Sequence, residues 1–132
     1  MYKDMGDVVR EALLESGCAK ELINDFDGHS TISLNFDNRP SILVSEDNGD
    51  IILWAKLCPF NELAIVQNSA SIIPFILEGF PYSVTGQLQI MEDEGELVVK
   101  AFIRREFYPA EHFSQALEMF YHQLCALDEK LR

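Results

Sequence analysis

The chain has 132 residues and an acidic composition, with 22 Asp and Glu against 10 Lys and Arg and a formal net charge of −12. This length predicts a single domain, residues 1–132, whose core is large enough to fold without disulfide or metal supports. The negative charge repels phosphate backbones and anionic lipid, so nucleic acid and membrane surfaces are excluded as partners, whereas a basic or neutral polypeptide is favoured.

Cysteine usage and the termini indicate the compartment. Cys18, Cys58 and Cys125 are widely spaced and form no CxxC pair, so neither a disulfide framework nor a zinc site is expected. The N-terminus lacks the basic region and apolar run of a signal peptide. The longest apolar stretch, Ile72 to Leu77, is far shorter than the roughly 18 to 20 residues of a membrane span. We therefore expect a cytoplasmic protein without cofactors.

The first predicted elements are a helix and a strand. Apolar residues recur at helical spacing from Met5 to Leu13, with Asp4 as the capping residue and Gly17 as the residue that ends the helix. From Ser30 to Phe36 the pattern changes to the alternation of a strand that is buried on one face.

A hairpin follows. Asn38 to Pro40 is predicted as a turn and Ser41 to Val44 as the second strand. Asn48-Gly49 is typical of a type I′ turn, because both central residues of that turn need a positive φ. The turn leads into a third strand, Ile51 to Leu57.

The middle of the chain is predicted as a helix, because the apolar residues between Asn61 and Phe80 fall on helical rows. Pro74 lies inside this segment. A proline removes one backbone hydrogen bond and clashes with the preceding turn, so we expect the helix to bend or restart near Ala70 to Ile73.

The C-terminal third combines a hairpin and a long helix. Gln87 to Met91 and Glu96 to Arg105 are predicted strands, joined by the acidic turn Glu92 to Gly95. Pro109 opens the last helix. Its apolar stripe consists of Phe113, Ala116, Leu117, Phe120, Tyr121, Leu124 and Leu127. The whole order, helix, three strands, helix, two strands, helix, indicates an α+β fold with an antiparallel sheet.

No catalytic motif is present in the sequence. Asp27 to Ser30 holds an acid, an imidazole and a hydroxyl, but neighbouring residues rarely form a triad, so a turn at the strand entry is favoured. His112 and His122 are some 15 Å apart along a helix and cannot share a metal. Glu46 to Asp50 and Glu92 to Gly95 lack calcium-loop spacing and are interpreted as hairpin tips. We expect neither a catalytic nor a metal site.

Apolar residues occupy both faces of the predicted sheet. Ile52 and Trp54 share one face of the third strand, and Val98 and Phe102 share one face of the fifth. Alternation does not decide which face is the core. Two interpretations stay open, since helices or a second subunit could cover both faces, or one face could form a groove for a partner.

Several segments carry a resemblance to a known family. They are Val8–Leu13, Ser16–Cys18, Asp27–Ile32, Ile52–Ala55, Gly95–Leu97, Lys100–Ala101, Phe113, Ala116–Leu117 and Phe120–Tyr121. In this order and spacing, the chain resembles the class IB chaperones of type III secretion systems, the InvB/SpaK type. The resemblance implies an α-β-β-β-α-β-β-α homodimer without cofactor or catalysis. It also implies that the dimer holds the N-terminal chaperone-binding segment of effector proteins in extended form and keeps them secretion-competent.

Strand alternation and the family resemblance together predict two sets of site residues. The expected effector-binding anchors are Ile52, Trp54, Val98 and Phe102, with Leu43 as a weaker candidate on the neighbouring strand. The resemblance places the middle helix at the two-fold interface, where the expected residues are Ile72, Ile73, Ile76 and Phe80. Contact with a secretion ATPase is left open.

Two rival functions remain. A small α+β enzyme or ligand carrier would need an internal pocket with converging polar groups, for example acids around His29. A structural subunit of a larger assembly would bury the same apolar faces permanently.

Overall fold

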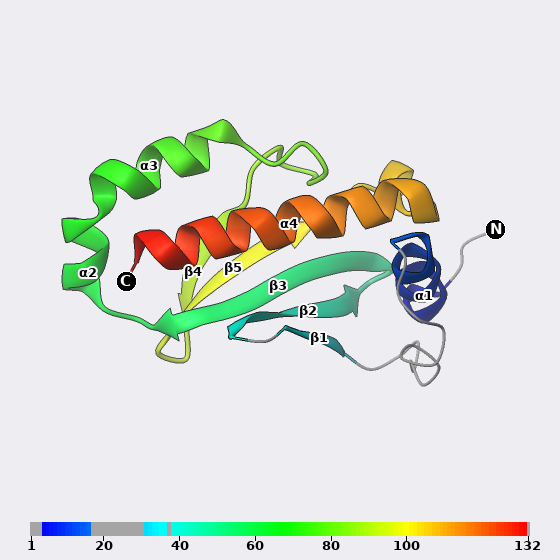
Figure 1. The fold of residues 1–132 in the computed structure, drawn as a ribbon, viewed down its shortest axis with the longest axis horizontal. Helices are drawn as coiled ribbons and strands as arrows, with labels where there is room; N and C mark the ends of the chain where they lie inside the picture. Colours follow the sequence, from blue (N-terminus) through cyan, green and yellow to red (C-terminus); the bar gives the residue numbers. More distant parts are fainter. Residues whose placement is uncertain (1–3, 17–30, 37, 132) are drawn as a thin grey trace.

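The computed structural model describes residues 4–16, 31–36 and 38–131, and Figure 1 shows their arrangement. Gly17, Cys18 and the segment Asp27 to Ser30 lie outside these ranges. The elements are α1 (Met5–Glu15), β1 (Ile32–Phe36), β2 (Arg39–Asp47), β3 (Asp50–Pro59), α2 (Glu62–Gln67), α3 (Ser69–Glu78), β4 (Gln89–Asp93), β5 (Glu96–Phe102) and α4 (Ala110–Lys130). The predicted α+β class and order of elements are confirmed.

The strands form one antiparallel sheet in the order β1-β2-β3-β5-β4. One face, called here the inner face, packs with α1 and α4 in the hydrophobic core. Its buried residues include Ile32, Ile42, Val44, Ile51, Leu53, Ala55, Val99 and Ala101. The cross-strand pairs Val44–Leu53 and Leu53–Ala101 place these side chains on one side, because paired residues in an antiparallel ladder point the same way.

Helix α4 is the long element that runs across the sheet in Figure 1. Its predicted stripe is buried except at Tyr121, which is half-buried. Phe120 packs edge-on against Phe80 with ring centroids 6.0 Å apart, a geometry that aromatic pairs favour. Helix α1 buries Met5, Val8, Val9 and Ala12, and the Asp4 carboxylate accepts a hydrogen bond from the Asp7 amide at 2.8 Å as predicted.

Both hairpins turn where the sequence indicates. Asn48 and Gly49 have φ angles of 52° and 85°, the positive pair that the Asn-Gly signal predicts. Glu94 and Gly95 repeat this conformation with φ angles of 51° and 82°. The fifth strand ends at Phe102 and does not reach Arg105, because Arg105 begins a short 3₁₀ helix, Arg105–Phe107.

The first turn is tighter than predicted. Arg39 and Pro40 belong to β2, so the turn does not extend through them. Proline cannot donate to a ladder, but the recorded β2–β3 pairing begins only at Leu43, beyond Pro40. The proline therefore sits where one neighbour is missing, which is the position that a sheet tolerates.

The middle helix breaks at Asn68, two residues before the predicted range Ala70 to Ile73. The Asn68 side-chain amide donates to the Ala64 carbonyl at 2.8 Å, and the Ser69 hydroxyl donates to the Val66 carbonyl at 2.9 Å. These side chains donate hydrogen bonds to backbone carbonyls at the end of α2, and so favour a helix end there. Pro74 lies inside α3 instead of at the break.

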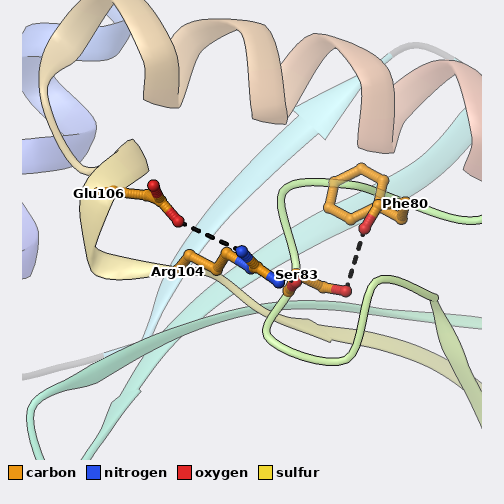
Figure 2. Close-up of polar contacts among 4 residues, drawn as sticks. All are labelled: Phe80, Ser83, Arg104 and Glu106. Carbon is orange, nitrogen blue, oxygen red and sulfur yellow. Dashed lines mark hydrogen bonds and ion pairs between the residues drawn. The ribbon is translucent and has the colours of Figure 1, made fainter.

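The loop from Gly79 to Leu88 is fixed to the residues around the end of β5, and Figure 2 shows Ser83 of this loop beside Arg104. Ser83, the buried polar residue of this loop, places its hydroxyl 3.1 Å from the Phe80 carbonyl. Arg104 donates from Nε to the Ser83 carbonyl at 3.0 Å and pairs with Glu106 at 3.4 Å. The Val84 amide also donates to the Phe102 carbonyl at 2.8 Å. The loop thus continues the sheet for a few residues beside Phe102.

We expect Arg104→Ala to lower the free energy of unfolding by about 1 kcal/mol, since the hydrogen bond of a half-exposed arginine side chain contributes at the low end of the range for charged donors. Thermal denaturation followed by circular dichroism measures the change. Glu106→Gln is the matched control, because it removes only the exposed ion pair and should change stability by less than about 0.5 kcal/mol. Equal losses in both variants would contradict the role given to the Ser83 contact.

Candidate functional site

The face of the sheet opposite the core, called here the outer face, carries all five predicted effector-binding residues. Cross-strand pairing places Leu43 opposite Trp54 and Ile52 opposite Phe102. Val98 pairs with Lys56, two residues beyond Trp54 on β3, and so faces the same way. The structure therefore brings these five side chains together on one surface.

This surface is separate from the hydrophobic core. None of the five residues belongs to the core cluster or packs against it. Ile52 and Val98 are buried, whereas Leu43, Trp54 and Phe102 are partly exposed. Of the two open interpretations, helices over both faces do not apply to the described residues, because α1 and α4 pack on the inner face.

Trp54 is held in position on the outer face. Its indole Nε1 donates to the Ser45 hydroxyl at 2.9 Å, and the Thr31 and Ser45 hydroxyls lie 3.0 Å apart. A fixed indole loses little side-chain entropy when a partner covers it, so it is suited to act as an anchor.

Two further residues extend the surface. Met91 pairs with Val98 and is 42 % exposed, and Val84 lies beside Phe102 and is 60 % exposed. The predicted set missed both. Met91 lies in a predicted strand and could have been found by alternation, whereas Val84 lies in a loop without any pattern. Together the outer patch consists of Leu43, Ile52, Trp54, Val84, Met91, Val98 and Phe102.

The predicted subunit-interface residues separate into two groups. Ile72 and Phe80 are buried within the subunit, Phe80 against Phe120, so they have little surface to offer a second subunit. Ile76 is half-buried, and Ile73 is 54 % exposed. Ile72 faces the core from α3, whereas Phe80 lies beyond the end of that helix and packs into the core from the following loop. Only Ile73 and Ile76 therefore keep surface that a second subunit could cover.

An exposed apolar stripe runs along the two short helices instead. It comprises Leu63 and Val66 in α2 and Ile73 and Leu77 in α3, and each is more than half exposed. Leu63 and Leu77 expose 64 % and 68 % of their surface. Large apolar side chains clustered in this way are typical of an interface.

A groove, called here the side groove, lies between α1, β1 and α4 and has a volume of about 370 Å³. Its lining is mainly apolar: Leu13, Leu34, Phe36, Ile42, Leu117 and Tyr121, with Ser16, Ser114 and Glu118. The Phe36 and Tyr121 rings contact each other with centroids 4.6 Å apart and planes tilted by 46°. Within the described sheet, β1 pairs only with β2, so its other edge lies open beside this groove.

A further groove, with a volume of about 540 Å³, lies between α3 and α4. Phe75, Met119 and Ala126 line it together with a polar set. His122 approaches Glu118 at 3.8 Å, but both side chains are largely exposed and the pair contributes little. No nucleophile and base converge in either groove among the described residues. His29, which was named as an example of a polar group for the rival enzyme or ligand carrier, lies outside them.

The search for metal and membrane features gives two further findings. No group of three or more potential metal ligands occurs in residues 4–16, 31–36 and 38–131. No helix in this part of the chain is long and apolar enough to span a membrane. Burial raises the pKa of the Cys58 thiol, and Asp128 and Glu96 raise it further, so this thiol stays protonated near neutral pH and is a poor nucleophile.

Comparison with known sequences supports a family assignment. Residues 17–94 match the model of the Invasion protein B family. The chain is 38% identical over 124 residues to the Surface presentation of antigens protein SpaK of Salmonella typhimurium strain LT2, and the match covers 93% of this chain and 92% of that protein. The protein of the same name from Salmonella typhi matches equally.

Solved structures with the same fold agree. The chain superposes on a chain of the HopA1–SchA chaperone–effector complex with a TM-score of 0.64 at 16% identity, covering 93% of this chain and 91% of that one. It also superposes on a chain of the heterodimeric ExoU–SpcU complex of the Pseudomonas aeruginosa type III secretion system, with a TM-score of 0.58, 18% identity and 93% coverage of both chains. At these identities the likeness shows the fold alone.

Proposed function

The chain belongs to the Invasion protein B family of type III secretion chaperones, and we propose that it holds the N-terminal segment of effector proteins in extended form, which keeps them soluble and competent for secretion. Proteins of this family act by binding and not by catalysis. One solved structure of the same fold, HopA1–SchA, is a complex of a chaperone with an effector, which supports an effector as the partner here.

The observation that carries the proposal is the outer patch, an apolar surface that the described helices leave uncovered. Ordering an unfolded segment costs about 1 to 2 kcal/mol of backbone entropy per residue. Burying each apolar anchor stabilises the complex by about 1.5 to 3 kcal/mol. Trp54, Phe102 and Leu43 have surface left to bury, whereas Ile52 and Val98 form the floor beneath them.

The side groove is the second proposed contact, and it was not predicted from the sequence. The open edge of β1 can pair with the main chain of an extended segment, and alternate side chains of that segment then reach the groove beside it. Main-chain pairing is indifferent to sequence, while the groove selects for apolar side chains. This combination suits a chaperone that serves more than one effector.

We further propose that two copies associate through the exposed stripe Leu63, Val66, Ile73 and Leu77. An isologous dimer buries the same patch on both subunits. Ile76, half-buried beside this stripe, is retained from the predicted set. A dimer would double the surface available to one effector segment.

The place of action that we propose is the cytoplasm, and residues 1–132 would act as a single chaperone domain. The acidic composition keeps a protein with exposed apolar patches soluble. No described surface is assigned to a secretion ATPase.

Protease footprinting tests the proposal. The purified chaperone captures proteins from the secreted fraction of its source bacterium, and each complex is then digested briefly. We expect an N-terminal segment of the captured protein to resist digestion only in the complex, and its deletion to abolish capture. Capture that survives this deletion, with protection confined to folded domains, would contradict the proposal.

A further inference from the structure

We propose that the bound effector segment carries an acidic residue between its apolar anchors, and that Lys56 and Lys100 of the outer face receive it. This inference rests on the proposed function and adds the charge of the partner. It concerns a short stretch of the segment, whose remaining residues are neutral or basic.

The sheet register brings the two lysines into the outer patch. Lys100 pairs with Trp54 on one side and with Gln89 on the other. Lys56 pairs with Val98 and lies two residues along β3 from Trp54, on the same face. Lys56 and Lys100 are therefore diagonal neighbours on adjacent strands, a separation of roughly 7 to 8 Å that lets both ammonium groups reach one carboxylate.

Within residues 31–36 and 38–131, the paired strands place no acid at the centre of the outer face to neutralise these cations. The central positions on β3 and β5 are Ile52, Trp54, Lys56, Val98, Lys100 and Phe102. Among the described strand residues, acids with the same orientation occur at the hairpin tips, in the pairs Asp47–Asp50 and Asp93–Glu96. Neither lysine forms an ion pair with a residue in the described part of the chain.

This placement is unusual for the composition. The whole chain has 10 Lys and Arg against 22 Asp and Glu, yet two lysines adjoin each other on an apolar surface. Neighbouring like charges disfavour the folded sheet, and a bound anion removes that repulsion. A carboxylate that is partly desolvated between Trp54 and Val98 gains more from this pair than it would in open water.

The net charge explains why only one or two acids suit the segment. At long range the protein repels an acidic polypeptide and attracts a basic one. Salt screens this long-range field over about 8 to 10 Å, whereas the lysines act at contact. A mostly basic segment with a buried acid satisfies both requirements, and this combination discriminates against uniformly charged chains.

Three synthetic peptides test the proposal. They share one alternating sequence of apolar and small polar residues, and only the central residue differs: Glu, Gln or Lys. Fluorescence anisotropy against the whole protein measures their affinities. We expect the Glu peptide to bind about fivefold to tenfold more tightly than the Gln peptide, and the Lys peptide to bind more weakly than both.

Charge reversal locates the effect. The double variant Lys56→Glu and Lys100→Glu should reverse the order of the three peptides, while Lys130→Glu, in the groove between α3 and α4, is the matched control and should leave it unchanged. Equal affinities for the Glu and Gln peptides, or an order that survives the double reversal, would overturn this inference alone. If none of the peptides binds to the folded protein, the role of the outer patch in the proposed function fails as well.

Discussion

Replacing Trp54 by alanine is expected to weaken effector binding by about 30-fold to 1,000-fold, because central tryptophans of an interface typically contribute about 2 to 4 kcal/mol. The indole lies between Leu43 and Lys100 in the outer patch and is oriented by the Ser45 hydroxyl at 2.9 Å. Titration calorimetry with the protease-protected effector segment measures the affinity. Trp54 is only half-buried, so the cooperative thermal transition should remain, with a loss of about 1 to 2 kcal/mol.

Ser45→Ala is the matched control for this prediction. It removes the hydrogen bond that positions the indole but leaves the aromatic surface, so effector affinity should fall by less than about fivefold. Loss of the cooperative transition in Trp54→Ala, together with loss of binding, would assign Trp54 to the core and contradict its place in the binding surface.

The two-faced strands show what alternation could predict. Ile51 to Ala55 is apolar at every position, so the sequence indicated which residues share a face without indicating which face is the core. Ile52 and Trp54 share one face of β3, as alternation predicted. The structure adds that Ile51, Leu53 and Ala55 lie on the inner face. Only the docking of α1 and α4, a tertiary event, separates the two faces.

Turns were predictable because their chemistry is local. Asn48-Gly49 satisfies a positive φ at both positions without help from the rest of the fold. The break in the middle helix was less predictable, since two local signals compete there. Pro74 argued for a bend close to itself, but the side chains of Asn68 and Ser69 bond to the carbonyls of α2 and end that helix earlier.

The binding surfaces depend on contacts between distant segments. Phe80 looked like one more residue of an apolar helix row, yet it lies beyond α3 and packs on Phe120 of α4. Leu34 and Phe36 alternate with polar residues in the first strand, which predicts an inward face, and they line the side groove with Tyr121 at the margin of the core. Val84 joins the outer patch only because Ser83 and Arg104 fix its loop to β5.

The proposed dimer interface is the other place where one substitution should have a large effect. Leu77 is 68 % exposed at the end of α3, one helical turn from Ile73, and both lie in the stripe proposed as the subunit interface. Leu77→Asp would place a charge in an apolar contact on both subunits at once, in a protein that already has a net charge of −12. We expect the dissociation constant of the dimer to rise more than about 100-fold, by analogy with central interface residues elsewhere.

Sedimentation velocity at micromolar concentration measures this change. The wild type should sediment at twice the 15.0 kDa subunit mass and Leu77→Asp at that mass, with the same thermal transition shape. Val84→Asp is the matched control, because it charges an equally exposed apolar residue on the outer patch and should leave the dimer intact. A wild type that sediments as a single subunit, or a Leu77→Asp variant that stays dimeric, would contradict the interface, and in the second case the side groove and the edge of β1 would be the next surface to charge.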